Sequence, residues 1–487
     1  MVLVRNLAGK SPSGAVGLIV LLGLILNLSG TWLPLIDRDE PRFAGASAEM
    51  LARQDWVVPW FNGEPRYDKP PLIYWAQIAA YECLGENSVA ARLPSVLFSI
   101  GTALLIYFWT RRQAQPKTAL VAAVIFSTCL QVLIHARLAV ADLSMIFFVC
   151  AAQWSGWELT RPGAAERWRW WAFFYVSLAL GFLAKGPVAW LPLGGLLLGR
   201  WLRPQAFVLP AGKTVLGLVL MLGLVALWGI PAELRTHGDF ARVGLGYHVV
   251  YRSFGVMDGH GGHGLLGWLA STPFFLVLFF FSFFPWAFRV PGALRKWWPL
   301  RQDDIFGWYL LTQAGLVFLV FTLVRTKLPH YTLPAFPCLA MWLARAGESG
   351  LVPDLKVFRN TVIMAVLVLV ITNTGNFVKD TIFPSHHLFE KARPQLTPAM
   401  KFGAVEFTEP SLVWEFEAVV TNHLEVLSAE DSVDFMRAGK PALLILPTSL
   451  YAANPAQWGT NLSVVQIQGI NFAHNASQIG LTALIRH

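Results

Sequence analysis

Acidic and basic residues lie close together just after the first long apolar segment, in the run Asp37-Arg38-Asp39-Glu40-Pro41-Arg42. A carboxylate held at a membrane surface can accept a proton from a substrate hydroxyl group, as a general base does. The apolar residues from Phe43 to Leu51 recur three and four positions apart, which predicts an amphipathic helix lying on the bilayer. We therefore predict catalytic roles for Asp39 and Glu40 and a substrate contact for Arg42. The alternative is that these are ordinary solvated loop residues.

A second group of chemically capable residues is the segment Tyr67-Asp68-Lys69-Pro70-Pro71. Its prolines fix an extended turn through which a helix cannot run. Lys69 carries a compact charge that suits a phosphate group, and Asp68 could bind a cation or hold Lys69 in place. The alternative is an interfacial lysine whose aliphatic stem lies beside Tyr74 and Trp75.

Asp142 lies inside the apolar run from Leu138 to Phe148, near the predicted start of a membrane helix. A carboxylate in such a place is costly unless it faces protein or water, so it marks a functional site by default. The positive end of the helix dipole favours its ionised form. Pairing with Arg137, a short distance upstream, is the structural alternative.

Lys185 and Lys327 each stand at a break between apolar segments, on the side of the membrane that we predict to be external. Together with Lys69 they predict a basic rim that binds an anionic head group. A single lysine in such a position is more often a membrane anchor.

The loop at 236–264 is rich in histidine and glycine. His260 and His263, together with Asp258 and with His248 or Asp68 as a further ligand, could bind a divalent metal ion. A His-x-x-His pair is a weak signal, and the surrounding glycines equally favour a flexible lid.

Long apolar segments must position these residues. The 487 residues are 55% hydrophobic and only 14% charged, whereas soluble proteins carry roughly 25% charged residues. Apolar runs of this length cross a bilayer as helices, and the short basic loops between them are typical of the cytoplasmic side. The predicted spans, about eleven in all, are residues 14–36, 88–110, 118–135, 138–158, 169–185, 187–203, 214–234, 265–288, 305–325, 329–346 and 357–378.

An odd number of spans places the segment 379–487 on the same external side as the loops 37–87 and 236–264. Apolar runs such as Ala442–Leu446 alternate there with polar, Gly- and Pro-containing stretches, which predicts a small α/β domain. The predicted fold is therefore an all-α polytopic membrane domain at 1–378, with amphipathic helices at the membrane surface, followed by an α/β domain at 379–487.

Composition also argues against several classes of function. The net charge of +9 comes largely from the short basic loops, where it serves topology, so we predict no nucleic-acid partner. The chain shows no glycine-rich phosphate-binding loop, so we predict no nucleotide cofactor. The scattered cysteines are typical of small core residues.

Several short motifs follow one another in the order found in one known family. They are Asp39-Glu40-Pro41-Arg42-Phe43-Ala44, Asp55-Trp56-Val57-Val58-Pro59, Asn62-Gly63, Tyr67-Asp68-Lys69-Pro70-Pro71-Leu72-Ile73-Tyr74-Trp75, Ala91-Arg92-Leu93-Pro94-Ser95, Lys185-Gly186-Pro187 and Lys327-Leu328-Pro329-His330-Tyr331. Across nearly the whole predicted membrane part, the chain resembles the bacterial branch of the GT-C glycosyltransferases. That branch includes the lipid A aminoarabinose transferases and is akin to the protein O-mannosyltransferases.

The resemblance implies a role for each matching residue. Asp39 matches the catalytic acidic residue of the family, and Asp142 matches the acidic residue that follows the third helix. Lys69 matches the lysine that meets the lipid-linked phosphate, and Arg252 and Tyr331 line the same phosphate.

Two further matches concern a metal ion. Asp68 stands where the family usually has glutamate, at a position linked to metal binding in the aminoarabinose transferase. His248 falls near the histidine partner of that residue.

The resemblance also implies an activity. The sugar donor would be a polyprenyl phosphate sugar such as undecaprenyl phosphate sugar, used on the periplasmic face of the bacterial inner membrane. The acceptor would be lipid A, another envelope glycan or a protein. A transporter or flippase for lipid-linked sugars and a structural assembly subunit are the alternatives, although the repeated halves common in transporters are not evident.

Overall fold

The computed structural model describes residues 12–161, 167–207, 211–256, 264–347 and 354–487. The chain divides into two compact units. We call the first the helical unit; it comprises Met1–Ser29, Tyr67–Ile73 and Arg92–Leu369. We call the second the sheet unit; it comprises Gly30–Arg66, Tyr74–Ala91 and Val370–His487.

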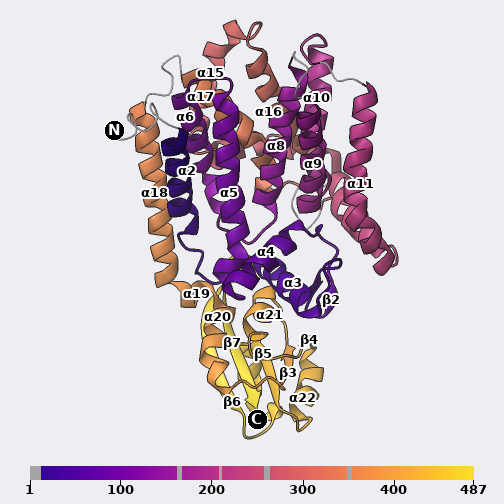
Figure 1. The fold of residues 1–487 in the computed structure, drawn as a ribbon. Coiled ribbons are helices and arrows are strands. Elements are labelled where there is room, and N and C mark those ends of the chain that lie inside the picture. Colours follow the sequence, from indigo (N-terminus) through magenta and orange to yellow (C-terminus); the bar gives the residue numbers. More distant parts are fainter. Residues whose placement is uncertain (1–11, 162–166, 208–210, 257–263, 348–353) are drawn as a thin grey trace. The chain divides into compact units, whose positions relative to one another are not determined.

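The helical unit is built from helices that pack in pairs, among them α8 on α9, α6 on α17 and α10 on α16 (Figure 1). The helices that lie in it wholly or in part are α2 (Pro12–Leu28), α5 (Ser88–Arg111), α6 (Pro116–Ser127), α7 (Leu130–His135), α8 (Asp142–Thr160), α9 (Arg167–Lys185), α10 (Leu191–Leu202), α11 (Ala211–Arg235), α12 (Arg252–Phe254), α13 (Gly264–Ser271), α14 (Phe274–Ser282), α15 (Val290–Trp297), α16 (Ile305–Leu323), α17 (Phe336–Gly347) and α18 (Asp354–Phe377).

Several of these helices are long and apolar enough to cross a membrane. Among the described residues, 4 helices have the length and apolar composition of a membrane span: Ser88–Arg111, Gly212–Arg235, Ile305–Leu323 and Lys356–Phe377. The pair Leu266–Ser282 and Ala287–Leu300, bent by 104°, raises the number to 5 if it counts as one span. A multi-span membrane protein is therefore confirmed.

Other predicted spans are interrupted, which the apolar pattern does not reveal. The predicted span 118–135 divides into α6 and α7, because Cys129 is extended and the following amide of Leu130 donates to the carbonyl of Phe284. The predicted span 187–203 opens with a 3₁₀ turn, Pro187–Trp190, after a glycine with a positive φ.

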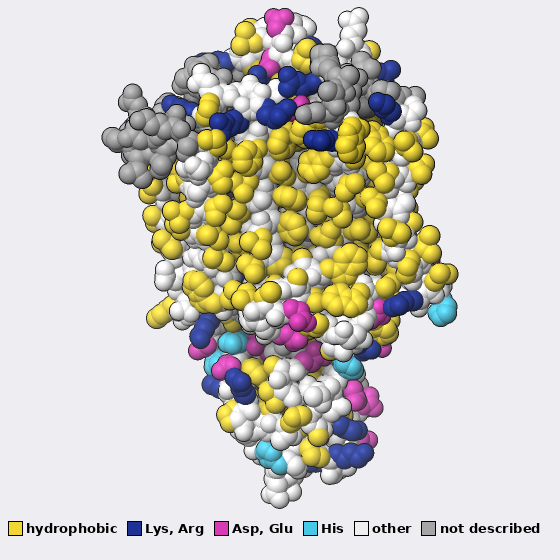
Figure 2. Space-filling model, in the orientation of Figure 1, with side chains coloured by type: hydrophobic (Ala, Val, Ile, Leu, Met, Phe, Trp, Pro, Cys, Tyr) yellow, Lys and Arg dark blue, Asp and Glu magenta, His cyan; other side chains and the backbone are white. Residues whose placement is uncertain are grey.

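Apolar side chains cover the visible surface of the helices, whereas Lys and Arg gather near α10 and α15 at one end of the bundle (Figure 2). On α11, the exposed fractions of Val219 and Leu227 are 62% and 75%. Apolar surface of this extent is expected to face lipid rather than water.

The sheet unit joins the segment after the first helix to the C-terminal part of the chain. It contains α3 (Asp39–Arg53), the hairpin β1 (Trp60–Phe61) and β2 (Glu64–Pro65), and most of α4 (Leu72–Leu84). Its C-terminal elements are α19 (Lys379–Ile382), α20 (Pro384–Ala392), β3 (Lys401–Ala404), α21 (Pro410–Phe416), β4 (Leu424–Val426), α22 (Ala429–Arg437), β5 (Ala442–Pro447), α23 (Thr448–Ala453), β6 (Ser463–Asn471) and β7 (Ser477–Arg486).

These strands form a five-stranded sheet in the order β4-β3-β5-β7-β6. The strands β4, β3 and β5 are parallel, and β7 pairs antiparallel with both β5 and β6. Alternate side chains of β5 enter two cores: Leu443 and Ile445 pack in one, Leu444 and Leu446 in the other. The predicted mixed α/β region is confirmed, with Ala442–Leu446 in its central strand.

Two predicted loops contain regular structure. The helix predicted after Asp39 is confirmed as α3, but its apolar residues Phe43, Ala44, Ala46 and Met50 are buried within the protein, so they are not available to lie on the bilayer as predicted. The loop predicted at 236–264 is instead partly helical, since Phe240–Tyr251 forms a π-helix that leads into α12.

Candidate functional site

Asp39 is the first residue of α3, and its carboxylate is exposed. Among the described residues it makes no hydrogen bond or ion pair, and the helix N-terminus stabilises its negative charge. The neighbouring Glu40 is only 2% exposed and accepts a hydrogen bond of 2.8 Å from the amide of Ile36. Of these two predicted catalytic carboxylates, Asp39 is therefore the one placed to meet a substrate.

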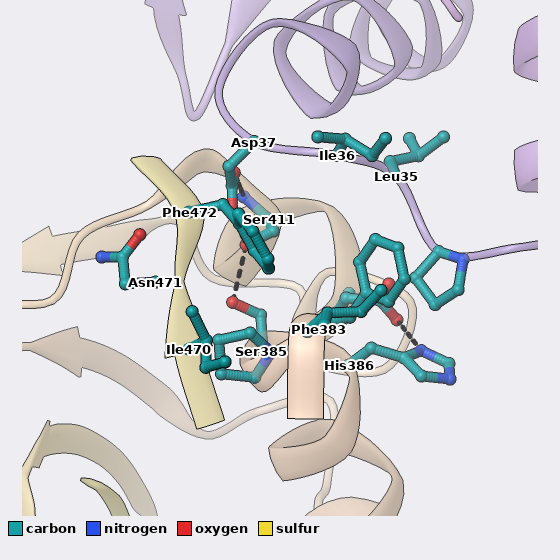
Figure 3. Close-up of a pocket in the computed structure, with 14 residues that line it drawn as sticks. Leu35, Ile36, Asp37, Phe383, Ser385, His386, Ser411, Ile470, Asn471 and Phe472 are labelled. Atoms are coloured by element: carbon teal, nitrogen blue, oxygen red, sulfur yellow. Dashed lines mark hydrogen bonds and ion pairs between the residues drawn. The ribbon is translucent and has the colours of Figure 1, made fainter. Parts of the chain in front are cut away.

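Asp37, which the sequence interpretation did not select, is held inside the sheet unit. Its carboxylate accepts hydrogen bonds from the amide of Ser411, at 2.9 Å, and from the Ser411 hydroxyl (Figure 3). The Ser411 hydroxyl also lies 2.6 Å from that of Ser385. These groups line a cavity of about 240 Å³ whose other walls include Phe383 and Phe472. The third carboxylate of this run is therefore used for internal contacts.

The environment of Asp37 makes the stability of the sheet unit depend on pH. The pKa of Asp37 is raised from 3.8 to about 6, mainly by burial; hydrogen bonds from Ser411 oppose the rise and the nearby carboxylate of Glu409 adds to it. Because the folded state holds the proton more tightly than the unfolded state, this residue's contribution to the free energy of unfolding falls as pH rises from about 4 to about 6. We expect Asp37→Asn to flatten that dependence in thermal melts. An unchanged slope in this pH window would contradict the assignment.

Asp142, the second predicted acidic residue, is paired within the helical unit. Its Oδ1 lies 2.5 Å from Nζ of Lys185, and the two side chains are 7% and 15% exposed. Arg137, considered from the sequence as its partner, instead donates from Nε to the carbonyl of Leu133 at 3.1 Å. The predicted pairing with Arg137 is therefore wrong. The cation that pairs with Asp142 is Lys185, the last residue of α9.

Breaking this pair should cost stability, because it leaves one buried charge without compensation. We expect Lys185→Met to lower the free energy of unfolding by about 3–5 kcal/mol, measured as a lower thermal midpoint in detergent. The double variant Asp142→Asn/Lys185→Met, which removes both charges, should recover part of that loss. A double variant that is as unstable as the sum of the single variants would contradict a direct pairing.

A histidine pair lies next to this ion pair. The ring centroids of His135 and His330 are 5.4 Å apart, and both rings interact electrostatically with Asp142. His330 also lies within electrostatic range of Lys69. Sequence interpretation did not select either histidine as a site residue, although His330 stands inside the motif Lys327-Leu328-Pro329-His330-Tyr331.

Arg252 and Tyr331 extend the same polar region. Nη1 of Arg252 donates to the Tyr331 hydroxyl at 3.4 Å, and Tyr331 interacts electrostatically with Asp142. The helical unit thus gathers residues from distant parts of the chain into what we call the phosphate cluster: Lys69, His135, Asp142, Lys185, Arg252, His330 and Tyr331. Three permanent cations against one carboxylate leave a positive excess, which suits an anionic group.

Lys327 has a different environment. Its ammonium group donates to the carbonyls of Phe321, at 3.0 Å, Thr322 and Val324, at the end of α16. An ammonium group has three donors, and this geometry favours a helix-capping role over the predicted substrate contact.

Only some of the predicted metal ligands are among the described residues. His248 Nε2 lies 2.8 Å from Oδ1 of Asp68, and the Lys69 ammonium donates to the carbonyl of Asp68 at 3.0 Å. His260 and His263 lie outside the described residues. A zinc site uses three or four protein ligands, so the described donors at Asp68 do not make a complete site.

A group with three potential ligands lies in the sheet unit. Oxygen or nitrogen atoms of Glu49, Glu417 and His423 all lie within 4.8 Å of one another. Burial and the nearby carboxylate of Glu49 raise the pKa of Glu417 to about 8. A cation there would relieve the repulsion between the two carboxylates, and this donor set fits a divalent metal better than the pair Asp68 and His248.

Comparison with known proteins finds relatives in sequence and in fold. Residues 68–228 match the family of the dolichyl-phosphate-mannose-protein mannosyltransferases. The chain is 27% identical over 492 residues to an undecaprenyl phosphate-alpha-4-amino-4-deoxy-L-arabinose arabinosyl transferase of Sodalis glossinidius, covering 94% of this chain and 87% of the relative. A protein of the same name from Erwinia tasmaniensis is 31% identical over 327 residues, which cover 66% of this chain and 56% of the relative.

The fold has also been seen before. The crystal structure of ArnT from Cupriavidus metallidurans bound to undecaprenyl phosphate matches with a TM-score of 0.74 and 18% identity, over 97% of this chain and 98% of that chain. The fold and the motifs define an integral-membrane glycosyltransferase. The chain is similar to the GT-C glycosyltransferases and, within them, to the aminoarabinose transferases.

Proposed function

We propose that this chain transfers 4-amino-4-deoxy-L-arabinose from undecaprenyl phosphate to lipid A. The names of its relatives support the donor, and the predicted kinship with lipid A aminoarabinose transferases supports the acceptor. In the reaction, the bond between C1 of the sugar and the donor phosphate oxygen breaks. An acceptor oxygen forms the new bond to C1, and undecaprenyl phosphate leaves with the electron pair of the broken bond.

The observation that carries this proposal is the phosphate cluster. The leaving phosphate gains negative charge as the C1–O bond breaks, and prearranged cations stabilise that charge in the transition state. Lys69 and Arg252 supply cations, and the Tyr331 hydroxyl, held by Arg252 at 3.4 Å, supplies a donor. The Lys185 ammonium lies 2.5 Å from Asp142 and compensates the charge of this carboxylate, which would otherwise repel the phosphate.

Asp39 acts on the acceptor in this proposal. A hydroxyl or a protonated phosphate must lose a proton as it attacks, and the exposed carboxylate of Asp39 can accept it. Arg42, one turn further along α3, is assigned to the acceptor's negative charge. Glu40, held by the amide of Ile36, keeps the start of α3 in place.

The finer topology is part of the same proposal. We assign about eleven membrane passages to residues 1–378 and a periplasmic position to residues 379–487, in the bacterial inner membrane. The gathering of Lys and Arg at one end of the helices (Figure 2) supports a cytoplasmic position for that end. A divalent metal, if the enzyme uses one, would be held by Asp68 and His248 or by the group at Glu49, and no step of the transfer depends on it.

The test is reconstitution of the purified protein in liposomes with the synthetic lipid donor and lipid A. We expect mass spectrometry to show lipid A gaining one aminoarabinose for each donor consumed. Cells lacking the gene should accumulate the lipid donor and lose the sugar from lipid A. If the donor is consumed only when a protein or another glycan is supplied, the acceptor assignment is wrong. If no acceptor leads to consumption, or if the donor only changes leaflet, the transferase proposal is wrong.

A further inference from the structure

The C-terminal region contacts the segment that carries Asp39 at several separate points, and all of these points lie within the sheet unit. We propose that residues 379–487 serve as a platform that fixes α3 and thereby positions the Asp39 carboxylate for transfer. This inference rests on the proposed function, in which Asp39 acts on the acceptor. It assigns a catalytic purpose to a region that is otherwise only a small α/β fold.

The first contact fixes the entry into α3. Asp37 binds the amide and the hydroxyl of Ser411, close to the start of α21. The next residue, Arg38, donates from Nε to Oε2 of Glu409 at 3.3 Å. Glu409 is 5% exposed, and its other oxygen accepts from the side-chain amide Nδ2 of Asn471 at 3.2 Å. The two residues directly before Asp39 are therefore bound to the platform, Asp37 through its own carboxylate and Arg38 through the buried carboxylate of Glu409.

The second contact fixes the chain beyond the end of α3. The side-chain amide of Asn62 donates to the carbonyl of Leu424 at 3.0 Å, and its oxygen accepts from the Leu424 amide at 2.7 Å. A Cβ on Gly63, whose φ is +78°, would come within 2.7 Å of the His423 ring. At Gly63 the hairpin that follows α3 therefore lies close to His423, which directly precedes β4, and the positive φ also favours glycine at this position.

The third contact supports the body of the helix. α21 packs against α3. On α4, the Tyr81 ring stacks on Trp414 of α21 with centroids 6.5 Å apart. The Tyr81 hydroxyl donates to the carbonyl of Ala44 in α3 at 3.1 Å. α3 is therefore held at its start, along one side and beyond its end, as a positioned catalytic group requires.

This support matters for the position of the exposed Asp39 carboxylate, because no side chain among the described residues binds that carboxylate directly. A displacement of about 1 Å at a catalytic group can cost roughly 10²-fold in rate. The platform residues are far from the phosphate cluster in sequence and belong to the other unit, so loosening the platform should leave donor binding intact.

The experiment measures kcat, the affinity for undecaprenyl phosphate and hydrogen–deuterium exchange in Ser411→Ala and Glu409→Gln. We expect kcat to fall about 10-fold or more, the affinity for undecaprenyl phosphate to stay within about twofold, and the amides of residues 39–46 to exchange faster. Ser411→Thr, which keeps the hydroxyl, should restore both the rate and the protection. Glu425→Gln, at an exposed position on β4, is the matched control for Glu409→Gln and should change nothing.

The three readouts separate this inference from the proposed function. Unchanged exchange in residues 39–46 for both variants would overturn the platform, whatever the activity. A kcat that stays at the wild-type value despite faster exchange would overturn its positioning role. A donor affinity that falls as much as kcat would do the same, since it would indicate a general structural effect. Faster exchange in a protein that transfers no sugar would sustain the anchoring of α3 and overturn the catalytic purpose together with the proposed function.

Discussion

Asp39→Asn is expected to lower kcat by roughly 10²–10⁴-fold, the usual contribution of a general base, while leaving the affinity for undecaprenyl phosphate unchanged. The amide cannot accept a proton, yet it keeps the size and the exposed position of the side chain at the start of α3. The measurement is initial-rate transfer in liposomes, with donor binding followed separately by titration of undecaprenyl phosphate.

The control for this variant is Glu64→Gln, which removes an exposed carboxylate from the same sheet unit. Its kcat should match that of the wild type. An Asp39→Asn protein that folds, reaches the membrane and transfers at the wild-type rate would show that Asp39 has no catalytic role.

The pH profile of the same variant identifies what Asp39 does. A phosphate monoester has its second pKa at about 6, so a lipid A phosphate has no proton left to lose well above that pH. The rate difference between wild type and Asp39→Asn should therefore shrink as pH rises from about 6 to about 8 if a phosphate oxygen attacks. A hydroxyl acceptor keeps its proton throughout this range, and the difference would then stay constant.

Lys69→Ala is expected to weaken binding of undecaprenyl phosphate by about 10-fold to 100-fold, because a hydrogen bond to a charged group contributes about 1.5–3 kcal/mol. kcat should fall as well, since the same ammonium group stabilises the charge that develops on the leaving phosphate. Lys69→Arg keeps the charge but not its compact shape, so it should recover only part of the loss. Binding is measured by titration of the lipid phosphate, and kcat at saturating donor.

Lys213→Ala, which removes an exposed lysine from α11 of the same unit, is the matched control for net charge. It should bind the lipid phosphate as the wild type does. Equal effects of Lys69→Ala and Lys213→Ala would mean that only the overall positive charge matters, and would remove Lys69 from the site.

Local sequence patterns predicted the elements that depend on local physics. The three-and-four spacing after Asp39 predicted α3, and a short continuous apolar run predicted the central strand at Ala442–Leu446. The paired prolines after Lys69 end the turn just before α4 begins at Leu72. In each case the periodicity or the restricted backbone of a short segment is enough to decide the structure.

Pairings between distant residues could not be predicted in the same way. The sequence offered the nearby Arg137 as an ion-pair partner for Asp142. The partner in the structure is Lys185, which is 43 positions away in the chain. Lys327 looked like a cation available to a substrate until the end of α16 was seen to occupy its donors. Charged residues that look equivalent in the sequence differ in burial and in hydrogen bonding, and therefore in role. Neither property can be predicted from the spacing of residues.

The amino-acid sequence was enough to predict a multi-span membrane protein and to show its resemblance to the GT-C glycosyltransferases, because hydropathy and a set of ordered motifs are properties of the linear chain. The tertiary structure was needed to assign different roles to the three neighbouring carboxylates of Asp37, Asp39 and Glu40. Asp37 is bound to Ser411, which lies 374 positions away, Glu40 is bound to the backbone of Ile36, and Asp39 is left exposed. The physical reason is that the roles of adjacent charges depend on which side chains and backbone groups the fold brings to each of them.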